Sequence, residues 1–184
     1  MQSSESDLRS LAMSRPTAAE TLANRLLSGR PTPEARADAF QALGIVARER
    51  GEISRAIRLF RAGVRAADAA GQVDRRADLL ASLGHSLALA GRRAPALTCF
   101  DQALAGLRGI ESAQVLVRRS VARVAFGDDE AAYADARAAA RIFHRAGDLV
   151  WEARARNNVG GILVTLGRFG EADLQYRKAQ ALAE

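Results

Sequence analysis

Three side chains of this sequence could take part in nucleophilic or metal chemistry, namely one cysteine and two histidines. Cys99 with His85 or His144 would form a Cys–His pair if the fold brought them together, because a histidine base activates a thiol. Cys99 lies in the middle of a predicted helix beside Phe100, however, where a small buried thiol is the common finding. No third group that would orient such a pair is evident. We therefore predict that the chain is not an enzyme.

Neither a metal site nor a phosphate-binding loop is indicated. Structural zinc sites need clustered cysteine and histidine ligands, which two distant histidines and one cysteine do not provide. The pair Gly160-Gly161 lies inside a predicted helix, where small residues allow neighbouring helices to touch, and not in a strand-to-helix loop. We expect no cofactor.

The charge of the chain is positive but mixed in sign. The formal net charge is +6, Lys178 is the only lysine, and arginines alternate with acids as in residues 48–52. There is no polybasic block, and a mixed-sign surface is typical of ordinary solvation. We predict that nucleic acid is not the partner. A nucleic-acid-binding solenoid is kept as an alternative, which a steep loss of affinity with salt would reveal.

The termini and apolar runs indicate a cytoplasmic protein. The first seven residues are polar and acidic, so no signal peptide is readable. Apolar runs are too short to span a membrane, and the single cysteine excludes an intramolecular disulfide.

The secondary structure predicted to position Cys99, His85 and His144 is a series of helices that repeats along the chain. Aromatic residues make up 5% of the sequence and there are four prolines, a composition that favours helices over sheets. One dipeptide column has steps of 40, 36 and 40 residues: Leu43-Gly44, Leu83-Gly84, Arg119-Ser120 and Val159-Gly160. A turn glycine, a small residue, a bulkier residue and a second small residue follow in the same register: Gly51, Gly91, Gly127 and Gly167; Ala56, Ala96, Ala132 and Ala172; Phe60, Phe100, Ala136 and Tyr176; Gly63, Ala103, Ala139 and Ala179.

These columns predict stacked helix pairs, because no pair can bury its apolar face alone. Glycine tolerates the left-handed conformation that ends a helix, so Gly71, Gly109 and Gly147 are expected to end the repeats. The predicted pairs are 34–50/53–70, 75–90/93–108, 112–126/129–146 and 149–166/169–183. The corresponding repeats are about 34–71, 72–109, 111–147 and 148–184, within one array over 34–184. We expect a disordered start over 1–15 and a leading helix over 16–30, with a capping box at Thr17 and Glu20.

The columns resemble the tetratricopeptide repeat, in which Leu-Gly, a turn glycine, alanine, an aromatic residue and alanine recur. The second and fourth repeats match best, through Leu83, Gly84 and Phe100 and through Gly160 and Tyr176. The third departs, with Arg119 and Arg123 where the family packs apolar groups. The resemblance implies an all-α, right-handed superhelical solenoid of four helix pairs plus one N-terminal helix.

The resemblance also implies a binding groove lined by the first helix of each pair, and hence a protein or peptide partner. Groove positions of the family correspond here to Gln41, Ile45, Arg48, His85, Leu89, Val117, Val121, Val124, Arg154, Asn157 and Val164. An apolar middle with polar ends suits an amphipathic helix or an extended segment. Asn158 matches an asparagine that in some members contacts peptide backbone; a hydrogen bond to a neighbouring helix is the equal alternative. For Trp151 we favour packing against the preceding helix over ligand binding.

A narrower resemblance is to the N-terminal repeat region of bacterial CHAT-domain proteins, in which a caspase-like domain follows the repeats. It rests on the runs 41–51, 115–119 and 145–154. It implies that the chain is the regulatory, scaffolding part of a longer protein that continues past Glu184. A self-assembling unit, with a homodimer formed through the C-terminal repeat, is a further alternative because the last helix lacks a polar cap.

Overall fold

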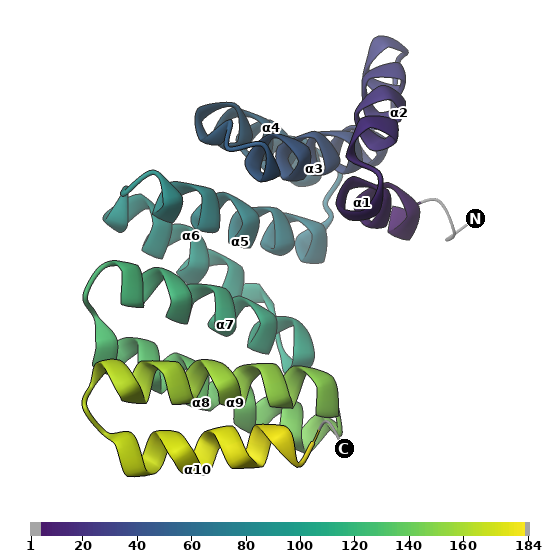
Figure 1. Cartoon of the computed structure of the whole chain (residues 1–184). Coiled ribbons are helices and arrows are strands. Elements are labelled where there is room, and N and C mark those ends of the chain that lie inside the picture. The colour runs from purple at the N-terminus through teal and green to yellow at the C-terminus, as the bar shows by residue number, and fades with distance from the viewer. Residues whose placement is uncertain (1–4, 183–184) are drawn as a thin grey trace. The chain divides into compact units, whose positions relative to one another are not determined.

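The computed structural model describes residues 5–182, with side chains from residue 8 onward, and within this range the chain is all-α. No strand occurs among these residues, and none of their helices is long and apolar enough to cross a membrane. The ten helices are α1 (Glu5–Ser14), α2 (Pro16–Ser28), α3 (Pro33–Glu49), α4 (Ile53–Ala69), α5 (Val73–Leu89), α6 (Arg93–Gly106), α7 (Gly109–Ala125), α8 (Asp129–Ala146), α9 (Leu149–Thr165) and α10 (Phe169–Gln180) (Figure 1).

The glycines predicted to break the helices do so, except Gly109, which was expected to end a repeat and is instead the first residue of α7. The predicted turn and terminal glycines all have positive φ angles, between 59° and 76°, a region that side chains with a Cβ avoid. Gly147, for example, is the left-handed C-cap of α8, and its N–H donates to the carbonyl of His144. The observed helices therefore follow the predicted pairs to within a few residues.

The N-terminal segment is where the sequence prediction was wrong. Residues 5–14 of the segment predicted to be disordered form α1, and residues 1–4 lie outside the described range. Leu8 and Ala12, one helical turn apart, are both buried, and α1 packs against α2 and α3. Two apolar residues at this spacing give a short helix one buried face. The residues around them are mostly polar, which is why the sequence was interpreted as disordered.

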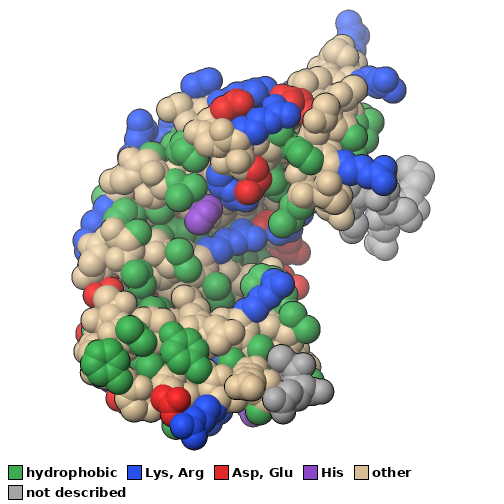
Figure 2. Space-filling model, in the orientation of Figure 1, with side chains coloured by type: hydrophobic (Ala, Val, Ile, Leu, Met, Phe, Trp, Pro, Cys, Tyr) green, Lys and Arg blue, Asp and Glu red, His purple; other side chains and the backbone are tan. Residues whose placement is uncertain are grey.

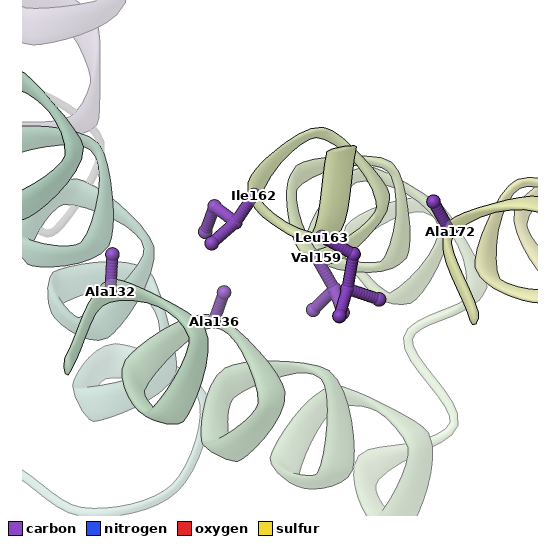
Figure 3. Packing of buried hydrophobic residues seen from close by; sticks show 6 residues of the cluster. All are labelled: Ala132, Ala136, Val159, Ile162, Leu163 and Ala172. Carbon is purple, nitrogen blue, oxygen red and sulfur yellow. The ribbon is translucent and has the colours of Figure 1, made fainter. Parts of the chain in front are cut away.

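The chain divides into two compact units, residues 1–102 and 103–184. In the N-terminal unit, α2 packs on α3, α3 on α4 and α4 on α5. In the C-terminal unit, α7 packs on α8, α8 on α9 and α9 on α10. Figure 3 shows Ala132 and Ala136 of α8 facing Ile162 of α9, with Ala172 on α10.

Ion pairs cover the surface where α2 meets α3 and α4. The Glu20 carboxylate accepts from Arg50 at 2.6 Å and from Arg55 at 3.1 Å, and Arg55 also pairs with Glu52 at 2.8 Å. The hydrogen bond from Arg50 outweighs burial and lowers the pKa of Glu20. Figure 2 shows the basic and acidic side chains intermingled over these helices, as expected for a solvated mixed-sign face.

The glycine of the Leu-Gly column is required by the ring that faces it. A Cβ on Gly44 would lie 2.6 Å from the Phe60 ring. In the third repeat Ser120 takes the glycine position and is fully buried, and the residue in the ring column is Ala136. Ser120 has a side chain where the other repeats have glycine, and Ala136 has no ring that this side chain would meet. The two changes compensate each other, which supports the 36-residue step in the alignment of the third repeat.

Arg119 and Arg123 of α7 replace apolar core residues by an ion-pair network around Asp135 of α8. Arg119 donates twice, from Nε to Oδ2 at 2.8 Å and from Nη2 to Oδ1 at 2.7 Å. Arg123 Nη1 lies 2.9 Å from Oδ2 of the same carboxylate. Asp135 is buried, so its charge needs both arginines.

Candidate functional site

The predicted groove positions of the N-terminal unit are mostly covered. Gln41 and Ile45 on α3 are buried, and Arg48 is half-buried. On α5 His85 is half-buried, whereas Leu89 is exposed. Of these five side chains, therefore, only Leu89 is fully open to a ligand.

Gln41 belongs to a partly buried polar cluster, defined here as Arg9, Asp38, Gln41, Arg75 and Asp78. Gln41 Nε2 donates to Asp78 Oδ2 at 2.5 Å, and Arg75 Nη1 donates to Gln41 Oε1 at 2.8 Å. Arg75 Nη2 also lies 2.8 Å from Asp38 Oδ1. Arg9 Nη1 donates to the same Asp78 oxygen at 2.8 Å. The polar cluster therefore connects α1, α3 and α5.

The first-helix face of α3 already holds a helix of the chain itself. Because Arg9 and Gln41 share one oxygen of Asp78, α1 lies directly beside Gln41. Figure 1 shows α1 next to α3 and to the start of α5. Leu8 and Ala12 supply the buried apolar side of α1. A short amphipathic helix thus occupies part of the surface for which the sequence predicted a ligand.

The corresponding side chains of the C-terminal unit are more exposed. Val121 on α7 is 46% exposed and Val164 on α9 is 44% exposed, and Asn157 is also exposed. Val117 and Val124 are half-buried, and each packs against a core cluster. The structure thus divides the predicted valines into two that support the core and two that are free to contact a ligand.

Asn158 makes the hydrogen bond to a neighbouring helix that was one of its two predicted roles. Its Nδ2 donates to Ser120 Oγ on α7 at 2.7 Å, and Ser120 Oγ donates to the Val117 carbonyl at 2.8 Å. This amide donor therefore ties α9 to α7.

Trp151 packs on the preceding helix, as predicted. Its ring stacks on Phe143 of α8 with centroids 5.6 Å apart. The guanidinium of Arg154, a predicted groove residue that is exposed, lies 5.2 Å above the Trp151 ring. The contact holds Arg154 by a cation–π interaction.

Cys99 has the environment of a packing residue. Burial raises the pKa of its thiol, although the charge of Arg61 acts in the opposite direction. A nucleophilic cysteine needs a lowered pKa. Within residues 5–182 there is also no group of three or more His, Cys, Asp or Glu side chains that could hold a metal ion.

Glu152 is a buried carboxylate that the sequence did not single out. It is 1% exposed and accepts from Arg156 Nε at 2.8 Å, while His144 Nδ1 lies 3.1 Å from each of its oxygens. Burial acts to raise the pKa of Glu152, but the hydrogen bonds from Arg156 and His144 outweigh it and the pKa is lowered. Arg156 Nη1 also donates to Gln175 on α10 at 3.2 Å. The group ties α8, α9 and α10 together.

A cavity of about 580 Å³ opens beside this group. Three arginines of α8, Arg137, Arg141 and Arg145, lie along it at spacings of four residues. Ala140 and Val159 contribute apolar lining. The sequence prediction missed this surface, although the repeated spacing of four and the absence of acids between residues 136 and 147 were visible.

Known structures resemble the whole described chain, whereas no protein-family model and no curated protein matches it. BtubC (BKLC) from P. vanneervenii superposes with a TM-score of 0.78 at 16% identity, covering 98% of this chain and 87% of its own. A putative kinesin light chain of Podosopora anserina with nearly identical TPR-like repeats gives 0.73 at 13% identity, covering 97% and 92%. The fold is TPR-like.

A third TPR-like match is MamA (AMB-1), with a TM-score of 0.58 at 18% identity, covering 97% of this chain and 95% of its own. At these identities the likeness concerns the fold. It confirms the predicted TPR-like helical repeats, and the identity of a partner is a separate question.

Proposed function

We propose that this chain is a protein-interaction module that binds a helical segment of a partner on the first-helix faces of its TPR-like repeats. The observation that carries the proposal is the position of α1. Its buried Leu8 and Ala12 and its Arg9–Asp78 ion pair are the contacts that an amphipathic helix from another protein would make on the same kind of face.

The exposed side chains of the C-terminal unit suit such a ligand. Val121 and Val164 offer apolar contacts, and Asn157 offers an amide that can bond to backbone or polar side chains. The ligand favoured by these residues is an amphipathic segment with aliphatic anchors. Gln41 and Ile45 occupy positions where a carboxylate clamp would need basic residues, so a free C-terminus is not the proposed ligand.

We further propose that the module is the regulatory part of a longer protein with a CHAT-type effector. This finer proposal is supported by the runs 41–51, 115–119 and 145–154. Binding of a partner segment to the repeats would then control the effector.

Self-association is a second candidate, favoured by exposed apolar side chains of α9 and α10. Phe169 is 67% exposed, and Leu149, Val150 and Leu174 are also exposed. Figure 2 shows hydrophobic side chains at the surface over these two helices. An apolar surface of this kind can join two copies.

Affinity capture from an extract of the native cells tests the proposed face. Val121→Asp places a charge where an apolar contact is proposed, and Asn157→Ala removes the amide. We expect both to lose at least about 80% of the specifically captured protein. Val121→Asp buries a charge at the interface, and Asn157→Ala leaves a polar group of the ligand without its hydrogen-bond partner. Val73→Asp is the matched control, since Val73 is an exposed valine outside the predicted groove positions.

Capture that survives both substitutions would contradict binding on this face. Equal loss in Val121→Asp and Val73→Asp, with capture unchanged in Asn157→Ala, would indicate an effect of added charge and would also contradict binding on this face. Capture of only the chain itself, with a mass that rises with concentration and falls in Phe169→Asp, would favour self-association.

A further inference from the structure

The cavity beside α8 has a surplus of positive charge. Arg137, Arg141 and Arg145 are exposed and form no ion pair or side-chain hydrogen bond within the described residues. Most other arginines of the C-terminal unit are engaged, for example Arg119 with Asp135 and Arg156 with Glu152. The three side chains are therefore available to a ligand.

The acids near this cavity are already neutralised. Glu171 accepts from Arg168 at 2.7 and 2.8 Å, and this contact, with a smaller effect of Arg137, lowers the pKa of Glu171. Glu152 is held by Arg156 and His144. Neither Glu171 nor Glu152 is therefore available to neutralise the arginine row, Arg137, Arg141 and Arg145.

The spacing of the row fits a helix. Successive arginines lie four residues apart on α8, which is about 6 Å along the axis. Carboxylates four residues apart on a second helix repeat at the same interval. The cavity between them is partly apolar, with Ala140, Ile142 and Val159 in its lining, so it can also receive aliphatic side chains.

Single-stranded nucleic acid fits this surface less well. Such ligands need exposed aromatic rings on which bases stack. The one aromatic side chain in the lining is Tyr133, and the guanidinium of Arg168 lies 4.8 Å above its ring. The ring face is thus already covered on one side.

We propose that the cavity beside α8 is part of a groove along this helix that binds an acidic helical segment of a partner protein. Carboxylates at every fourth residue of that segment would face Arg137, Arg141 and Arg145. This surface lies on α8, the second helix of its pair, and differs from the first-helix face proposed above. It would allow two segments to bind the module independently.

The test is fluorescence anisotropy with the full chain and a labelled alanine-rich peptide that carries glutamate at three positions four residues apart. A peptide of the same composition with its glutamates spread around the helix is the first control. Arg137→Glu/Arg141→Glu/Arg145→Glu should weaken binding at least about tenfold, because three charge-assisted contacts are reversed. The three side chains are exposed, and circular dichroism would verify that the variant is folded.

Arg58→Glu/Arg61→Glu/Arg65→Glu on α4 is the matched variant. It changes the net charge equally, and its arginines are exposed. A change in affinity below about threefold in this variant supports binding at the α8 cavity, since exposed distant charges are screened.

Equal losses in both triple variants, or equal affinity for the two peptides, would overturn the proposal. Tighter binding of a dT oligonucleotide that displaces the peptide would assign the row to nucleic acid instead. Retention of peptide binding in Val121→Asp is expected, because the two surfaces are separate.

Discussion

At the scale of single residues, the fold depends on pairs of positions where a missing side chain on one helix admits a ring from the next. Gly44 accepts Phe60, and Gly160 accepts Tyr176, each with a ring atom 2.6 Å from where a Cβ would be. Ser120 and Ala136 show the alternative solution, with both side chains small and buried. The residue types in these columns therefore depend on the combined volume of two facing side chains, one on each helix of the pair. This explains why Ser120 can replace the glycine in the third repeat, where Ala136 replaces the ring.

Gly44→Ala should lower the free energy of unfolding by about 1–3 kcal/mol, because the Phe60 ring is buried and must move. Gly161→Ala is the control, because its Cβ would meet only the Tyr176 hydroxyl at 3.9 Å. Alanine is the better helix former, so this change should stabilise by about 0.5–1 kcal/mol. Urea unfolding followed by circular dichroism measures both. A Gly44→Ala variant as stable as the wild type would disprove the close fit.

At the scale of elements, helix positions could be predicted because they depend on local signals. Turn glycines and apolar periodicity lie within a few residues of the helix that they end or bury, and the predicted pairs match the observed ones closely. The role of Arg119 and Arg123 could not be predicted in this way. Their partner Asp135 lies on the next helix, and only the packed pair shows that one carboxylate receives both.

Asp135→Asn should destabilise the C-terminal unit by about 3–5 kcal/mol, because it removes the buried carboxylate charge that both Arg119 and Arg123 contact. Replacing Arg119, Arg123 and Asp135 together by leucine should leave stability near that of the wild type or above it, since apolar groups can replace a buried ion pair. Trp151 is the only tryptophan and lies in this unit, so its fluorescence during denaturation reports the transition. A triple variant less stable than Asp135→Asn would contradict this account.

At the scale of the whole molecule, the predicted ligand surface stays a prediction, and the structure shows which of its side chains a ligand could reach. The first-helix residues were identified through the family resemblance, but Gln41 and Ile45 are buried and α1 lies beside Gln41. Arg9 and Asp78 are 69 residues apart, and no local pattern connects them. The arginine row of α8 was missed for a similar reason, because a cavity is a property of packed helices.

The central claim is that a first-helix face of this chain accepts an amphipathic helix. The most direct measurement is the binding of a labelled peptide with the sequence of residues 5–15 to a chain that begins at Pro16, followed by fluorescence anisotropy. We expect saturable binding with a Kd of about 1–100 μM, in the range of modest peptide interfaces, with weaker binding to the full chain because its own α1 competes. Asp78→Asn should reduce the affinity, since the Arg9 ion pair is lost. Absence of binding to the shortened chain, shown to be folded by circular dichroism, would contradict the claim.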